Sequence, residues 1–376
     1  MNSARLTERL TALRPRIDLP SLLAVLFLVA VGVVMVSSAS SALAAQSNHD
    51  VFFYARRQGA FAVIGVVAMV VGASLPPDLF KRHPYALLGV AFFLLVIVLI
   101  PGIGRTAGGA RRWIEIGPVG IQAGEVMKLA LIVWLSYSLA DKVKNGRIVR
   151  FSTGVLPHLL VPGAAVLLLM GEPDFGTSVL LLSVTFILLF VAGARLGLLF
   201  GALVAVIPLA IHQIASSDYR MKRVLAFLDP WSHRSDIGYQ ITESLMTFGS
   251  GGLFGAGLGE SKQKLFFLPA AHTDFIFAVI GARALQAALR GNTPFDAYLT
   301  LGLTSLLLVQ MLFNICVVLG LVPTKGITLP FVSYGGSSLV ASMFMAGMLL
   351  RLISEGLSSP SGRSARGERW PTGGAP

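Results

Sequence analysis

The 376-residue chain is too apolar and too sparsely charged for a water-soluble protein. Hydrophobic residues make up 55% of it and charged residues 13%, whereas soluble domains carry about 25% charged residues. The formal net charge is +12, but no soluble basic domain exists to carry a nucleic-acid site, so we expect no nucleic-acid partner. Composition therefore predicts a membrane protein.

Nine apolar stretches approach the roughly 20 residues that a bilayer core requires. In chain order they are Leu19–Ser38, Gly59–Leu75, Pro84–Ile100, Ile121–Ala140, Val155–Met170, Phe175–Ala194, Leu196–Ala215, Tyr298–Val322 and Leu329–Ile353. Hydrocarbon forces the backbone to satisfy its hydrogen bonds within each segment, and the alternating pattern of a membrane barrel is absent. We predict an all-α polytopic membrane protein with about nine to ten transmembrane helices.

The first stretch resembles a secretory signal, because arginines precede it and small residues, SASSALAA, follow it. Its apolar core, Leu19–Val36, is longer than the usual 7 to 15 residues. Eight further stretches follow, so we expect a retained helix.

Basic residues assign the loops to the two sides of the membrane. By the positive-inside rule they place the N-terminus and the loops after the second and fourth spans in the cytoplasm. These residues are Arg5, Arg9, Arg14, Arg16, Lys81, Arg82, Lys142, Lys144, Arg147 and Arg150. We predict a cytoplasmic segment 1–18, a transmembrane domain 19–355 with one large extracytoplasmic loop 216–273, and a disordered tail 356–376 that is rich in Ser, Gly, Pro and Arg.

Two loops on the opposite, outer side are rich in basic residues, contrary to the positive-inside rule. They carry Arg105, Arg111, Arg112, Arg220, Lys222, Arg223, Arg234, Lys262 and Lys264. Acids of the same loops and lipid headgroups explain any one of these cations about as well as a ligand does. For the cluster as a whole we favour a polyanionic ligand at the outer surface, because arginine recognises phosphate in a planar, bidentate manner.

Polar residues at the ends of three spans are further candidates. Glu125 and Lys128 are three positions apart on one helix and should face the protein interior or a water-filled cavity, since a charge at bilayer depth costs roughly 2.5 to 3.5 kcal/mol. Mutual neutralisation explains them equally well. In GEPDFGT, Glu172 and Asp174 are expected in a tight outer turn, with Asp174 capping the next helix.

Four segments together resemble the SEDS family, the shape, elongation, division and sporulation proteins typified by FtsW and RodA. They are RRWIEIGPVGIQAGEVMKLAL, GEPDFGTSVLL, the run from DPWSHRSDIGYQ to LPAAHTDFIFAVIG, and GLVPTKGITLPFVSYGGSSL. The similarity extends from about Leu19 to Glu355, and GEPDFGT, VAGARL and PTKG favour the division branch, FtsW.

The resemblance implies a peptidoglycan glycosyltransferase of the bacterial cytoplasmic (inner) membrane that polymerises lipid II into glycan strands. It also implies a class B penicillin-binding protein, a single-pass transpeptidase, as partner, alongside other divisome or elongasome membrane proteins. In this family the aspartate of the HTDF motif is required for polymerisation, and here it is Asp274. A lipid II flippase and an inactive scaffold of the cell-wall machinery remain alternative functions.

Our hypothesis is that Asp274 acts as general base on the acceptor sugar's 4-hydroxyl, with inversion and departure of a polyprenyl diphosphate. Arg112, Lys128 and Lys264 would stabilise the diphosphate, and the participation of a divalent cation, Mg²⁺ or Mn²⁺, is left open. The histidines are scattered without metal-ligand spacing, which argues against a zinc site. The remaining predicted substrate-binding residues are Glu125, Gln263, His272, Thr273, Ser333 and Ser337. For the two serines, close helix packing is an equally good explanation.

One departure from the family affects the topology. Relatives continue the HTDF motif into IGEELG and a further helix, whereas here VIG runs directly into ARALQAALRGNTPFDAYL. Roughly one span's length, about 20 residues, is missing by this comparison. Either Phe275–Leu289 crosses the membrane as a short helix despite Arg283, with Arg290 at its inner end, or the chain is a deleted version whose activity is in doubt.

Overall fold

The computed structural model describes residues 17–48, 50, 52–107, 110–116, 119–216, 218–234, 238–251, 271–291, 293–323 and 326–358. Most of the predicted cytoplasmic segment 1–18 and of the predicted disordered tail 356–376 lies outside the described residues. So do two predicted substrate-binding residues, Gln263 and Lys264.

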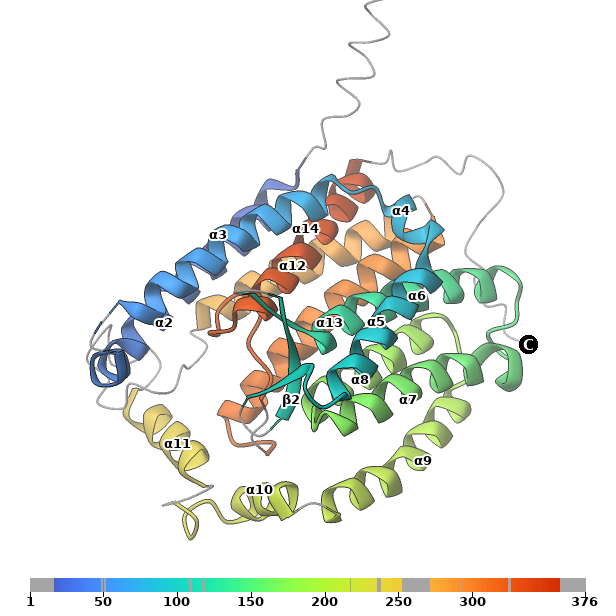
Figure 1. The fold of residues 1–376 in the computed structure, drawn as a ribbon. Helices are drawn as coiled ribbons and strands as arrows, with labels where there is room; N and C mark the ends of the chain where they lie inside the picture. Colours follow the sequence, from blue (N-terminus) through green and yellow to red (C-terminus); the bar gives the residue numbers. More distant parts are fainter. Residues whose placement is uncertain are drawn as a thin grey trace, which may run out of the picture.

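Helices form almost the whole of the described structure, in agreement with the predicted fold class (Figure 1). They are α2 (Leu19–Asn48), α3 (Phe53–Ser74), α4 (Pro77–Arg82), α5 (Pro84–Leu99), α6 (Ala123–Lys144), α7 (Leu156–Gly171, after a π-helical turn Phe151–Val155), α8 (Phe175–Val191), α9 (Leu196–Ala215), α10 (Asp218–Leu228), α11 (Tyr239–Gly251), α12 (Ala271–Arg290), α13 (Pro294–Val318) and α14 (Gly336–Ser358). Seven of them, α2, α3, α6, α7 with its preceding turn, α9, α13 and α14, are long and apolar enough to cross a membrane, and α5 and α8 are shorter apolar helices. These nine helices correspond to the nine predicted spans.

The helices of the last two spans begin at other residues than predicted. The predicted Tyr298–Val322 begins at Pro294 instead, because Thr293 caps α13 by accepting a hydrogen bond from the Asp296 backbone N–H at 3.2 Å. The predicted Leu329–Ile353 begins only at Gly336. The backbone φ of Phe331 is +69°, in the left-handed region, so no right-handed helix can run through this position, and the chain from Ile327 to Gly335 is not helical.

A small antiparallel sheet between α5 and α6 was not predicted. Its strands are β1 (Gly104–Ala107), β2 (Ala110–Ile116) and β3 (Val119–Gln122), in the order β1-β2-β3. The sheet lies at the same end of the bundle as the turn between α7 and α8 (Figure 1). We call this the outer end, and the opposite end, where α2 begins and α14 finishes, the inner end.

Helix α6 lies at the centre of the bundle, and α3 packs closely on α14 at its edge. The α3–α14 contact depends on glycine, since a side chain at Gly72 would collide with the backbone oxygen of Phe344, and one at Gly347 with that of Met69. Small residues at such crossings let two backbones approach closely enough for dispersion forces to hold them together within a membrane. Helix α2 packs in the same bundle, against α3 and α12.

The length and contacts of helix α12 bear on whether Phe275–Leu289 crosses the membrane. It is one continuous helix of 20 residues, longer than the predicted Phe275–Leu289, and at 1.5 Å per residue it spans about 30 Å. It packs against α2, α13 and α14. With α12 added to the seven long apolar helices and the two shorter ones, α5 and α8, the described part of the chain contains ten helices that we assign to crossings.

Two contacts identify the inner end of α12. The Arg283 guanidinium binds both carboxylate oxygens of Asp18, with Nε 2.9 Å from Oδ1 and 2.8 Å from Oδ2. Asp18 also accepts a hydrogen bond from the Ser21 backbone N–H, so it caps the start of α2. Near the end of α14, a Cβ at Gly356 would lie 2.6 Å from the Ala287 backbone oxygen.

The charge of Arg283 is therefore neutralised by a residue at the inner end of the bundle. Burial raises the pKa of Asp18, but the hydrogen bonds from Arg283 and Ser21 outweigh it and hold that pKa below its usual value. With an even number of crossings, the start of α2 and the end of α14 lie on the same side. This arrangement supports the short crossing helix over a topology with nine spans.

We predict that the loop after α12 faces the cytoplasm. A cysteine at the exposed position 290 (Arg290→Cys), in a chain whose native Cys316 is changed to serine, should react with a membrane-impermeant maleimide only after the cells are permeabilised. A Ser232→Cys variant, in the exposed outer loop, is the matched control and should react in intact spheroplasts. Labelling of position 290 from outside would rule out the crossing helix.

Candidate active site at the outer end

Asp274 lies in the first turn of α12, at the outer end of the bundle. The side chains of His272, Thr273 and Asp274 are outside the described residues, so only their place on the helix is established. Further along α12, a Cβ at Gly281 would lie 3.4 Å from Leu308 of α13. Asp274 precedes Gly281 by seven residues, which puts it about 10 Å closer to the outer end along the helix axis.

The connection between α13 and α14 lies directly beside α12. The ring of Phe277 stacks on that of Phe331, with ring centroids 6.1 Å apart. In the same connection Ser333 Oγ accepts a hydrogen bond from the Leu329 backbone N–H at 2.9 Å, so this predicted binding residue shapes its own turn. The Ser337 hydroxyl is buried and has no hydrogen-bond partner among the described residues.

Glu125 and Lys128 form a buried ion pair on α6. Lys128 Nζ lies 2.7 Å from Glu125 Oε2, and the exposed fractions of Lys128 and Glu125 are 1% and 7%. Both therefore face the protein interior, as predicted. Lys128 Nζ also donates to Gln310 Oε1 of α13 at 3.5 Å, and Gln310 Nε2 donates to the Thr328 backbone oxygen at 2.7 Å. A row of polar groups thus links α6, α13 and the connection that lies beside α12.

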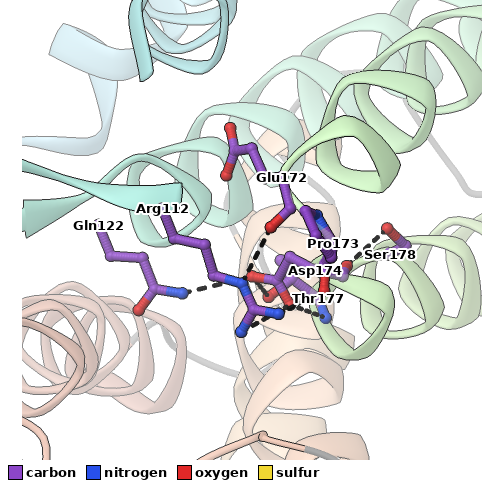
Figure 2. Close-up of polar contacts among 7 residues, drawn as sticks. All are labelled: Arg112, Gln122, Glu172, Pro173, Asp174, Thr177 and Ser178. Atoms are coloured by element: carbon purple, nitrogen blue, oxygen red, sulfur yellow. Dashed lines mark hydrogen bonds and ion pairs between the residues drawn. The ribbon is translucent and has the colours of Figure 1, made fainter. Parts of the chain in front are cut away.

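The turn between α7 and α8 is held by Asp174 (Figure 2). Its carboxylate accepts hydrogen bonds from the Thr177 backbone N–H at 3.2 Å and from the Thr177 hydroxyl at 2.9 Å, which confirms the predicted helix cap. Gln122 Nε2 of β3 donates to the same carboxylate at 3.3 Å. The turn and the sheet are thereby joined.

Arg112 of β2 is bound to this turn. Its guanidinium donates to the backbone oxygens of Glu172, at 3.3 Å, and Pro173, and lies 4.0 Å from Asp174 Oδ1 (Figure 2). Arg112 was predicted to bind the substrate diphosphate. In this conformation its donors are engaged within the chain, and its clearest role is to fix the turn against the sheet.

Most other outer cations also have partners in the chain. Arg105 pairs with Glu115, Arg111 donates to the Leu99 backbone oxygen, Arg220 donates to Gln213, Arg234 pairs with Glu243, and Arg223 interacts within the chain as well. Of the outer cations within the described ranges, Lys222 alone has no such partner. Loop acids and backbone oxygens thus account for most of the cluster that we had interpreted as a polyanion site.

Glu172 is a buried acid whose environment the sequence did not reveal. Its exposed fraction is 0%, and neither carboxylate oxygen accepts a hydrogen bond from any described residue. Burial, and secondarily the nearby Asp174, raise the pKa of Glu172 to about 8, although Arg112 opposes the shift. Glu172 therefore carries a proton at neutral pH. A glutamate in a turn is ordinarily solvated, so its position between two apolar helices was the available signal.

The described residues do not provide a ready metal site. No three His, Cys, Asp or Glu side chains among them lie close enough together to hold an ion. Consequently we assign no step of the reaction to the divalent cation that the sequence left open.

We predict that Glu172→Gln removes a pH dependence of stability. Between about pH 4.5 and 8 the unfolded chain loses this proton while the folded chain keeps it. The group's stabilising contribution is thus complete below pH 4.5 and falls by about 1.4 kcal/mol per pH unit up to about pH 8. The melting temperature of the variant should therefore rise relative to that of the parent as the pH increases through this window. The exposed Glu115→Gln is the control, and parallel pH profiles for parent and Glu172→Gln would contradict the assignment.

We further predict that removing one partner of the buried ion pair destabilises the bundle. Lys128→Met leaves Glu125 charged and unpaired, at a cost of about 3 to 5 kcal/mol. The double variant Glu125→Gln, Lys128→Met should recover most of the melting temperature, since neither side chain is then charged. If the double variant also recovers glycan synthesis, the pair is purely structural, whereas stability without synthesis assigns it to the reaction.

Comparisons with known proteins agree with the fold and the site. The sequence profile of the FtsW/RodA/SpoVE family, described as cell cycle proteins, matches residues 20–284 and 282–356. A protein of Trichlorobacter lovleyi named probable peptidoglycan glycosyltransferase FtsW is 44% identical, over 90% of this chain and 93% of its own length. Stage V sporulation protein E of Bacillus subtilis is 39% identical, over 89% of this chain and 96% of its own.

Solved structures show the same architecture. A chain from the structure described as "Structural coordination of polymerization and crosslinking by a peptidoglycan synthase complex" superimposes with a TM-score of 0.75 at 26% identity, covering 91% of this chain and 99% of its own. The rod shape determining protein RodA of Thermus thermophilus gives a TM-score of 0.66 at 26% identity, covering 90% and 97%.

The comparisons also locate the shortened segment. The two parts of the profile match meet at residues 282–284, within α12. The alignment to the Trichlorobacter protein has 359 positions, yet 90% of 376 residues is about 338, so about 20 positions have no counterpart in this chain. The shortened segment thus lies within α12, which still reaches from one end of the bundle to the other. With these matches over nearly its whole length, the chain belongs to the FtsW/RodA/SpoVE family of cell cycle proteins.

Proposed function

We propose that the chain polymerises lipid II into peptidoglycan strands at the outer face of the bacterial cytoplasmic membrane, with its N-terminus in the cytoplasm. One observation carries the proposal. Asp274 lies at the outer end of a helix that crosses the bundle, and the connection beside that helix is linked to the buried Glu125–Lys128 pair. The name of the Trichlorobacter relative, a probable peptidoglycan glycosyltransferase, supports this chemistry.

In the proposed reaction Asp274 takes the proton from the acceptor sugar's 4-hydroxyl as that oxygen attacks the donor's anomeric carbon. The bond from that carbon to the diphosphate oxygen breaks, the configuration inverts, and the polyprenyl diphosphate leaves with the bonding electron pair. A positioned base of this kind contributes roughly 10² to 10⁴ in rate. A carboxylate at the membrane boundary is partly desolvated, which makes it a stronger base than one in water.

The departing diphosphate requires a positive charge to stabilise it, and the described structure helps to decide which predicted cation would supply that charge. Arg112 is engaged by backbone oxygens and Asp174, so Lys128 is the better placed of these two predicted residues. The Ser337 hydroxyl is a further donor in the proposal, since it is buried and unused. His272, Thr273, Gln263 and Lys264 stay in the proposal by their family resemblance alone.

The partner in the proposal is a class B penicillin-binding protein that cross-links the new strands. The similar chain in a peptidoglycan synthase complex supports such a partner, because polymerisation and crosslinking are coordinated in that complex. A role in cell division is supported by curated relatives named FtsW, at 39% to 44% identity over about nine-tenths of this chain. The sequence identity to the RodA structure is lower, at 26%.

We predict that Asp274→Asn abolishes strand synthesis from lipid II by the chain reconstituted in liposomes with its transpeptidase. The expected loss is at least about 10²-fold, because the amide cannot accept the proton. Asp218→Asn is the matched control, since Asp218 also lies in the first turn of an outer helix, and it should retain synthesis.

The same liposomes separate the alternative functions. Undiminished synthesis by a folded Asp274→Asn protein would show that this residue is not the base. Translocation of labelled lipid II without polymer, in the parent chain, would favour the flippase instead. If the parent chain produced no polymer and translocated no lipid II, the remaining function would be that of an inactive scaffold.

A further inference from the structure

The outer-loop helix α10 presents an apolar stripe on its surface. Met221, Leu225 and Leu228 follow the i, i+4, i+7 spacing of one helix face, and their exposed fractions are 36%, 47% and 71%. Trp231, just beyond the helix, is 55% exposed. By contrast Ala226, on the opposite side of the helix, is 1% exposed. The contacts of α10 within the described structure are mainly with α9, and the face that carries Met221, Leu225 and Leu228 remains exposed.

The preceding helix indicates what covers this face. Only 6% of the most apolar stretch of α9 is buried within the chain, so nearly every side of this candidate membrane-spanning helix is left uncovered by the described bundle. α10 follows α9 after two residues and remains in contact with it (Figure 1). Arg220 fixes the angle between them, since its guanidinium donates to both the backbone and the side-chain oxygen of Gln213, each at 2.8 Å. The exposed stripe is therefore attached firmly to a lipid-facing helix.

Charge on α10 fits a membrane surface. Lys222 lies next to the stripe, is exposed, and has no partner among the described residues. A lysine in that place can lay its aliphatic stem along the apolar surface and bring its amine to lipid phosphates. Trp231 suits the same level, because tryptophan is enriched at membrane–water interfaces.

We propose that α10 is an interfacial helix that inserts Met221, Leu225 and Leu228 among the acyl chains of the outer leaflet, with Lys222 at the phosphates of phospholipid headgroups. The outer loop, which leads from α9 to α12, is thereby held at the membrane surface. This proposal does not depend on the catalytic role of Asp274.

Spin labels on single cysteines test the proposal in the full chain, with Cys316 changed to serine, in nanodiscs that contain phosphatidylglycerol. Labels at 221, 225 and 228 should collide with oxygen, which concentrates in the bilayer, several-fold more than with a water-soluble nickel complex. A label at Leu203→Cys, an exposed position on α9, should show the same preference for oxygen. Labels at 222 and at the exposed Ser232→Cys should show the opposite preference.

Preference for the nickel complex at 225 and 228 would overturn the proposal. Low collision rates with both probes there would do so too, since they would mean that protein covers the stripe. The headgroup contact has its own test: Lys222→Glu should lower the oxygen preference of a label at 225 in anionic nanodiscs. An unchanged preference would contradict the contact with lipid phosphates.

Discussion

The ion pair between Arg283 and Asp18 determines how the chain is threaded through the bundle. An arginine within a crossing helix is costly in a membrane unless a partner neutralises it. Asp18 is that partner, and it is itself fixed as the cap of α2. Since α2 begins at the inner end, Arg283 must approach that end too, and the first turn of α12 then lies at the outer end. The end of the bundle at which Asp274 lies follows from a contact between two residues that are 265 positions apart in the sequence.

The same rule governs the other charged groups of the interior. Glu125 and Lys128 neutralise each other on one helix, and Gln310 extends their contacts to a second helix. The Glu172 carboxylate forms no ion pair with any described residue, although Arg112 lies nearby, and burial together with Asp174 keeps it protonated. Pairing and protonation are the two ways in which a buried acid avoids the cost of an isolated charge. This protein uses both close to its outer end.

Composition and spacing were sufficient to predict the helical spans, because hydrocarbon permits few other structures. They did not predict where α13 and α14 begin, which depends on the Thr293 cap and on the left-handed backbone conformation of Phe331. The sheet was missed because its strands are short and contain several glycines, so that alternation is weak.

In the candidate site, sequence could show which polar residues are unusual but not what they contact. The burial of Glu125 and Lys128 follows from the cost of a charge in lipid, and the Asp174 cap follows from its place before a helix. The engagement of Arg112 could not be foreseen, since backbone oxygens 60 residues away carry no sequence signature. The catalytic role proposed for Asp274 came from resemblance to relatives, because one aspartate at a helix start is ordinarily a cap.

Lys128 illustrates how a structural pair can also serve a reaction. In the resting conformation its charge is cancelled by Glu125, which makes the interior electrically neutral and stable. In the proposed reaction, a diphosphate bound beside the pair would compete with Glu125 for the ammonium group, and its greater charge would favour the exchange. Glu125 would then lose its cation, and a carboxylate left unpaired at that depth is costly, so the exchange would require another hydrogen-bond donor for Glu125.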